Sequence, residues 1–121
     1  MALPSNRPLS EASIHATMPD LSTSDTVYTP SPWRGRIVRY YSAIDNAITT
    51  ADGSVSLTIN GTAVTGSTIT VTQSGSAVGD VDSAIPTGAN YVNEGDYIGI
   101  VTTGACDTTC ITHFEIVIDR D

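Results

Sequence analysis

The sequence predicts an all-β protein: a single antiparallel β-sandwich, jelly-roll-like, that follows an extended N-terminal arm. The first observation is composition, because the 121 residues include 18 Thr and 13 Ser but no Lys. The apolar residues are mainly Val, Ile and Ala, and β-branched side chains suit a pleated sheet better than a helix. The second is a series of short alternating segments with turn signals about every 8–12 residues, which is typical of a two-sheet sandwich.

Residues 1–33 are predicted to form the arm, and residues 34–121 the sandwich. Five of the six prolines lie in the first 33 residues, and proline removes a backbone donor and disfavours helix at the preceding residue. Residues 10–18 would form at most one marginal helical turn. Side chains such as Tyr28 and Trp33 are too apolar for a purely solvating linker. We therefore expect an arm that becomes ordered against a neighbouring subunit, with a disordered tail as the alternative.

The first strand of the sandwich is predicted over residues 36–42, and the clearest one over 54–59. In the latter, Val55, Leu57 and Ile59 alternate with Ser and Thr, which indicates one buried and one exposed face. Asn60-Gly61 follows and is the strongest short signal for a two-residue hairpin turn. Strands over 62–64 and 67–72 complete a β-meander.

The remaining strands are predicted over residues 78–83, 91–92, 97–102 and 113–119, with breakers at 85–88 and 93–96. The last two long strands carry apolar residues on both faces. Val101 and Val117 lie opposite the expected core side. A second apolar face is wasteful in an isolated monomer, so we expect a subunit interface there.

Charge narrows the range of partners. The formal net charge is −8, and from Tyr40 onward the acidic residues are opposed by Arg120 alone. Such a surface repels phosphate backbones, so we expect no nucleic-acid partner. No run of 18 apolar residues predicts a membrane span, and the first 20 residues lack the build of a secretory signal, so we expect synthesis in a cytoplasm.

The positive charges gather in one place, where they form candidate partner contacts. These are Arg34, Arg36 and Arg39, next to Trp33 and close to Tyr28. Trp, Tyr and Arg dominate interface hot spots. The arginines would either meet an acidic partner surface or pair with acids of the same chain, and the second is the simpler interpretation.

Cys106 and Cys110 lie between two predicted strands and are a disulfide candidate, with two free thiols as the alternative. With Asp107 and His113 they also give a possible metal site, but the C-x3-C-x2-H spacing is unlike structural zinc. Two further pairs, Asp80 with Asp82 and Glu94 with Asp96, are weak calcium candidates without the EF-hand pattern. We expect no metal and no cofactor.

Nothing in the sequence indicates catalysis. It lacks the nucleophile elbow, the phosphate-binding loops and the H-E-x-x-H motif. Without Lys there is no Schiff-base chemistry, and the abundant Ser and Thr are explained by outward strand faces. We expect a protein that is not an enzyme.

Six motifs resemble the head decoration (cement) proteins encoded among bacteriophage structural genes. They are G-R-I-V-R, A-x-x-x-A-I-T-x-A-D-G, I-N-G-T-x-V-T-G, S-G-S-A-x-G-D-V-D-S-A-x-P-T, E-G-D-x-I-x-I-V-T-x-G and a final apolar strand ending at Arg, at residues 35–39, 43–53, 59–66, 74–87, 94–104 and 114–120. The resemblance implies a jelly-roll-type domain, a homotrimer, the major capsid protein as partner, and a place on the capsid surface of the virion. The tip with Cys106 and Cys110 departs from the Gly/Ser-rich loop of that pattern.

The alternative function is a carbohydrate- or receptor-binding head-fibre or adhesin module. It predicts exposed aromatic rings that form a sugar platform. The candidates are Tyr40, Tyr41, Tyr91 and Tyr97.

Overall fold

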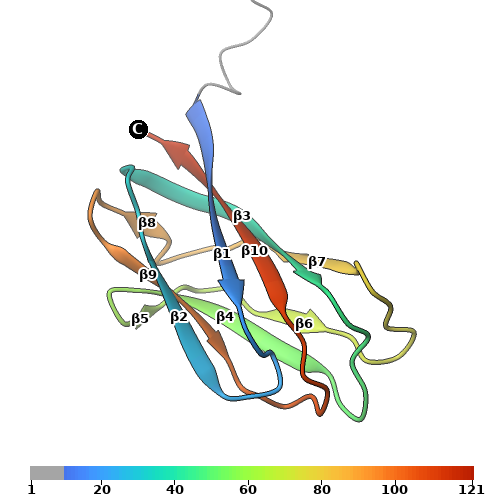
Figure 1. The fold of residues 1–121 in the computed structure, drawn as a ribbon. Helices are drawn as coiled ribbons and strands as arrows, with labels where there is room; N and C mark the ends of the chain where they lie inside the picture. The colour runs from blue at the N-terminus through green and yellow to red at the C-terminus, as the bar shows by residue number, and fades with distance from the viewer. Residues whose placement is uncertain (1–9) are drawn as a thin grey trace, which may run out of the picture.

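A computed structural model describes residues 10–121 of the chain, which form a sandwich of two antiparallel β-sheets (Figure 1). The sequence-based prediction of an all-β sandwich is therefore confirmed. Within this part of the chain, no helix is long and apolar enough to cross a membrane.

The first sheet, called sheet A here, has the strand order β1-β10-β3-β7, and β8 also pairs with β3. Its strands are β1 (Glu11–Met18), β3 (Gly35–Ile44), β7 (Val81–Ala84), β8 (Tyr91–Val92) and β10 (Thr112–Arg120). The second, sheet B, has the order β2-β9-β4-β5, and β6 also pairs with β4. Its strands are β2 (Asp25–Pro30), β4 (Gly53–Ile59), β5 (Thr62–Ala63), β6 (Ile69–Val71) and β9 (Tyr97–Thr102).

The core lies between the sheets and follows from the alternation in the sequence. In β4 every second residue is buried, from Gly53 to Ile59. The buried apolar side chains of sheet A face those of sheet B. On the sheet A side they include Ile37, Tyr40, Ile44, Phe114, Ile116 and Ile118, and on the sheet B side Val55, Leu57, Ile69, Ile98 and Ile100.

Tyr40 ties the two sheets together. It is fully buried on β3, and its hydroxyl contacts the carbonyl oxygens of Ser67 and of Val55, the latter at 3.2 Å. Burial raises the pKa of Tyr40 well above its ordinary value, so the hydroxyl remains a donor. A buried phenol needs such a partner.

The predicted division at residue 33 is corrected by the structure. Glu11–Met18 and Asp25–Pro30 are strands of sheets A and B, paired with β10 and β9. Glu11–Met18 form a strand and not a helical turn, because Ala12, Ile14, Ala16 and Met18 alternate with polar residues and point toward the core. The part of the predicted arm before Ser10 lies outside the described residues.

The strands predicted after residue 34 are confirmed, and their boundaries differ from the predicted ones by at most three residues. The hairpin turn at Asn60-Gly61 is also confirmed, since Asn60 and Gly61 have φ values of 50° and 87°, as a type I′ turn requires.

Candidate functional site

Trp33 lies at one end of the sandwich, where it is half-buried against the core. The guanidinium carbon of Arg120 lies 5.8 Å from the centre of its ring, a cation–π contact. A hollow of about 930 Å³ next to it is lined by Trp33, Arg34, Glu94 and Arg120, among others. Trp33 therefore supports the fold of its own chain with part of its surface and leaves the rest accessible.

The three arginines near Trp33 have partners within the chain. Arg34 Nε lies 3.5 Å from a carboxylate oxygen of Asp121. Arg39 Nη2 lies 2.6 Å from Glu11 Oε1, and this hydrogen bond raises the pKa of Arg39. Arg36 donates to Asn90 Oδ1 at 3.4 Å. The simpler interpretation, pairing with acids of the same chain, thus holds for Arg34 and Arg39. Arg36 is instead hydrogen-bonded to the side-chain amide of Asn90.

The five tyrosines fall into three groups, one of which, Tyr41 and Tyr91, lies on the outward side of sheet A. Tyr40 is in the core and is removed as a candidate for a sugar platform. Tyr28 and Tyr97 are 64% and 44% exposed and lie side by side on β2 and β9. Their ring centres are 5.6 Å apart at an interplanar angle of 76°, the edge-to-face arrangement that aromatic pairs prefer.

The outward side of sheet B, called the sheet B face, carries no Asp, Glu, His, Lys or Arg on its described strands. Pairing registers place its residues together on this side. They are Thr26, Tyr28, Pro30, Ser54, Ser56, Thr58, Ala63, Thr70, Tyr97, Gly99 and Val101. This uncharged, hydroxyl-rich face with two exposed tyrosines stands out on a chain of net charge −8.

Gly99 keeps the middle of the sheet B face flat. A Cβ at this position would lie 2.5 Å from Thr58 Oγ1, 3.2 Å from a methyl group of Thr26 and 3.4 Å from the Tyr28 ring. Gly99 is itself buried, because the Tyr28 ring lies over it. The glycine therefore seats Tyr28 on the sheet and fixes where the exposed ring stands.

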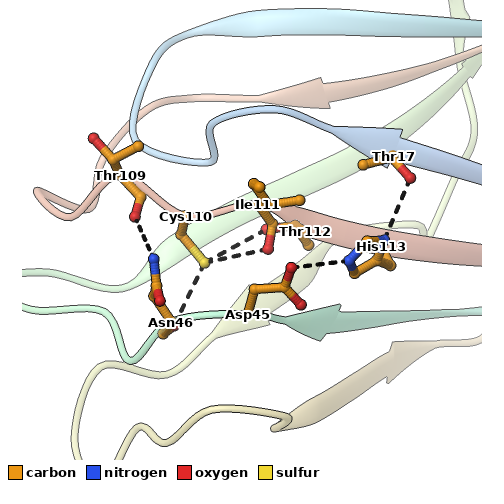
Figure 2. A network of polar contacts seen from close by, with 8 residues as sticks. All are labelled: Thr17, Asp45, Asn46, Thr109, Cys110, Ile111, Thr112 and His113. Atoms are coloured by element: carbon orange, nitrogen blue, oxygen red, sulfur yellow. Dashed lines mark hydrogen bonds and ion pairs between the residues drawn. The ribbon is translucent and has the colours of Figure 1, made fainter.

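The outward side of sheet A, called the sheet A face, is charged. Its ionisable residues are Glu11, His15, Arg36, Arg39, His113, Glu115 and Asp119. His15 Nε2 lies 3.3 Å from Glu115 Oε2, and Figure 2 shows His113 between Asp45, at 3.1 Å, and Thr17, at 3.3 Å. Because these pairs are exposed, they keep the sheet A face hydrated.

The prediction of a second apolar face has a different outcome on each of the two sheets. Val117 is only 7% exposed on the sheet A face. It lies across from Arg39 and Ser13 in the strand register, so its own chain already covers it. Val101 is half-buried on the sheet B face. The expectation of an uncovered apolar surface is therefore wrong for Val117, and the exposed apolar surface of sheet B is supplied by Tyr28 and Tyr97.

Both cysteines are buried free thiols that belong to the core. The Cys110 thiol donates toward the Asn46 carbonyl oxygen at 3.4 Å, as Figure 2 shows. Burial raises the pKa of Cys106, which makes it a poor nucleophile. The structure thus has the free-thiol alternative, not the disulfide.

The acidic pairs serve turns. Asp80 Oδ2 accepts from the Ala77 amide at 2.9 Å and Asp96 Oδ2 from the Asn93 amide at 2.8 Å. The hydrogen bond to Asn93 lowers the pKa of Asp96. Among residues 10–121, no three His, Cys, Asp or Glu side chains lie close enough together to hold a metal ion.

Sequence reasoning singled out Tyr28 and Tyr97 separately and did not see the face that joins them. The missing link was β2, whose two flanking prolines suggested an irregular segment. The signal was nonetheless present, because every outward residue of β4 is Ser or Thr and the outward residues of β9 are Tyr, Gly and Val.

No protein-family model and no curated protein matches the sequence. The fold is similar to a chain in the acidic stable capsid structure of Helicobacter pylori bacteriophage KHP30, with 14% identity, a TM-score of 0.57, and coverage of 88% of this chain and 85% of that one. It is also similar to part of the catalytic unit of a thermostable GH87 α-1,3-glucanase from Streptomyces thermodiastaticus, with 13% identity, a TM-score of 0.54, and coverage of 92% of this chain and 26% of that one.

Proposed function

We propose that this protein is a non-enzymatic structural component of a bacteriophage particle that binds the outside of the capsid through its sheet B face. The observation that carries the proposal is the placement of charge: the sheet B face has none, although the chain has a net charge of −8. Interface cores are depleted in charged residues and enriched in tyrosine. Tyr28 and Tyr97 would be the anchors, and the Ser and Thr hydroxyls around them would bond to a partner's backbone.

Two further considerations support a capsid role. The similarity to the chain in the KHP30 capsid structure extends over most of both chains, as expected for a domain that works alone. The motifs between residues 35 and 120 resemble those of head decoration proteins. A protein that binds an assembled lattice, and not its free subunits, stabilises that lattice by mass action. The partner would be the major capsid protein. The resemblance also implies copies of this chain in threes, an expectation that competes with the twofold contact proposed below.

A second candidate function is carbohydrate binding, as in a head-fibre or adhesin module. Tyr28 and Tyr97 favour it, because exposed rings beside a row of hydroxyls suit the apolar face and the polar edge of a sugar. The edge-to-face angle leaves the two rings out of one plane. Such a pair offers a sugar one ring at a time, whereas a protein surface can pack around both.

The test is attachment of the purified chain to undecorated capsids of the phage that encodes it. Tyr28→Ala and Tyr97→Ala should each weaken attachment at least ~30-fold, the effect of a hot spot of about 2 kcal/mol. Tyr91→Ala is the matched control, since Tyr91 is 39% exposed but faces outward from sheet A. Equal attachment by all three variants would contradict the proposal, and binding to a glycan array without capsid binding would favour the second candidate.

A further inference from the structure

Strand β1 is the longest unpaired edge in the described part of the protein. It has eight residues and pairs on one side with β10. In Figure 1 it runs along the margin of sheet A, next to β10. An edge strand presents a row of free N–H and C=O groups, and such a row is a template for another strand.

The register shows which groups of β1 are free. Ile44 exchanges backbone hydrogen bonds with Gly79 and Asp80, just before β7, so the even-numbered residues at this end of β3 bond toward β7. Hydrogen-bonding sides alternate along antiparallel strands. At this end of β3, before the register shift between Val117 and Ile118, odd-numbered residues therefore bond to β10, and even-numbered residues of β10 bond to β1. Following the pairing of Ile14 with Ile116, the backbone groups of Ser13, His15 and Thr17 point away from the sheet.

The other edges carry protective features that β1 lacks. Strand β2 ends in Pro30, which has no N–H to offer. Strand β7 has four residues, and one of them, Asp82, is half-buried and points inward, where burial raises its pKa. Strands β5 and β8 have two residues each. Short length, proline and inward charge are the devices that keep edges from pairing, and β1 contains none of them.

We propose that β1 pairs antiparallel with β1 of a second copy of this chain, about a twofold axis at Ile14. The two copies of sheet A then form one continuous sheet. Because the partner is the same surface, the contact closes on itself as an isologous dimer. The proposal concerns the edge of sheet A and is independent of what binds the sheet B face.

The residues of β1 suit this register. An axis at Ile14 places Ser13 opposite His15 of the second copy, with exchange of both free backbone hydrogen bonds. It places Glu11 opposite Thr17, so no like charges face each other directly. On the inner side, Ile14 meets its own copy and the small Ala12 meets Ala16. Ile14 is 8% exposed, whereas Met18 at the other end of β1 is fully buried, so the pairing would cover surface that now lies at the rim of the core.

Light scattering on the size-exclusion column tests the pairing. Wild-type protein should have twice the chain mass of 12.6 kDa. Ser13→Pro removes a free N–H without touching the bonds to β10 and should give a folded monomer, as should Ser13→Lys. Ser13→Thr, which keeps the N–H, should remain a dimer. A monomeric or trimeric wild-type protein would overturn the proposal, and so would a Ser13→Lys protein that stays dimeric.

A crosslink tests the register. In a pair that is not hydrogen-bonded, opposite Cα atoms lie about 4.5 Å apart, within the range a disulfide spans. Ile14→Cys treated with a thiol oxidant such as diamide should therefore give a covalent dimer. Ala16→Cys, which faces Ala12 and not its own copy, should give none. Equal crosslinking of both variants, or of neither, would contradict the twofold axis at Ile14.

Discussion

The outer faces of the two sheets have opposite chemistry. The sheet A face carries acids, arginines and both histidines, and most of them are joined in exposed pairs such as Glu11 with Arg39. The sheet B face has hydroxyls, a glycine and two exposed tyrosines. Exposed ion pairs stabilise a fold very little, but they keep a surface hydrated. This difference is the reason for proposing the sheet B face, and not the sheet A face, as the side that contacts a partner.

Under the proposed function, the same contrast would allow a strongly acidic protein to attach to a capsid in many copies. Neighbouring copies repel each other through their net charge. A contact made through an uncharged face avoids both this repulsion and the cost of desolvating charged groups. The acidic remainder then keeps the free protein soluble.

The largest expected effect tests the flatness of the sheet B face. Gly99→Ala would push a Cβ to 2.5 Å from Thr58 Oγ1, and relieving that clash should cost about 1–3 kcal/mol of the free energy of unfolding. It should also displace the Tyr28 ring and weaken attachment. Urea denaturation measures the first effect.

Gly88→Ala is the control for Gly99→Ala. Its Cβ would have ordinary contacts of 3.5 Å or more with Thr65, so its stability should change little. If Gly99→Ala were as stable as Gly88→Ala, the sheet B face would be more adaptable than we describe.

A smaller effect is expected on the sheet A face. Arg39→Met removes the pair with Glu11 but keeps an apolar stem over the sheet near Val117. Because both partners are about one-third exposed, the loss should be below about 1 kcal/mol and should disappear at high salt. Denaturation at low and at 1 M salt measures it, and a large, salt-independent loss would mean that the sheet A face is more than a hydrated surface.

A further effect concerns Asp20, in the turn that leads from β1 to β2. Hydrogen bonds from the Ser22 hydroxyl and amide, from Thr23 and from the Cys110 amide lower its pKa from 3.8 to about 2. A lowered pKa stabilises the folded state above pH 3.8, and this contribution is lost as the pH falls toward 2. The stability difference between wild type and Asp20→Asn should therefore shrink across that interval.

The pH series also separates the two faces. The sheet B face has no carboxylate or imidazole, so attachment should not change between pH 5 and pH 8. A strong change in attachment there would point to the sheet A face as the contact. Sedimentation of capsids with the bound protein, at a series of pH values from 5 to 8, measures this attachment.

The strands after residue 34 were predictable because the alternation of apolar and polar residues, or a turn signal, is visible within each short segment. Val55, Leu57 and Ile59 alternate cleanly, and Asn60-Gly61 requires a tight turn. Strands β1 and β2 were not, because prolines flank both and β1 uses small Ala12 and Ala16 as inward residues. Their pairing with β10 and β9 spans about a hundred and about seventy residues of sequence. A pattern read over a short stretch of sequence cannot reveal partners that lie so far away along the chain.

The candidate site shows the same limit. Composition singled out Tyr28, Trp33 and the arginines as candidate partner contacts. Their roles depended on neighbours brought from the far end of the chain: Arg120 stacks on Trp33, Asp121 pairs with Arg34, and Gly99 seats Tyr28. The uncharged face is a property of the five strands of sheet B together, and no single segment displays it.

Hydroxyl-radical footprinting of the capsid-bound protein is the most direct test of which face makes the contact. Tyr28 and Tyr97 report on the sheet B face, and His15 and His113 report on the sheet A face, all four being accessible in the free chain. The two tyrosines should lose most of their oxidation on binding while the two histidines keep theirs. Protection of the histidines with tyrosines left as reactive as in the free protein would contradict the account.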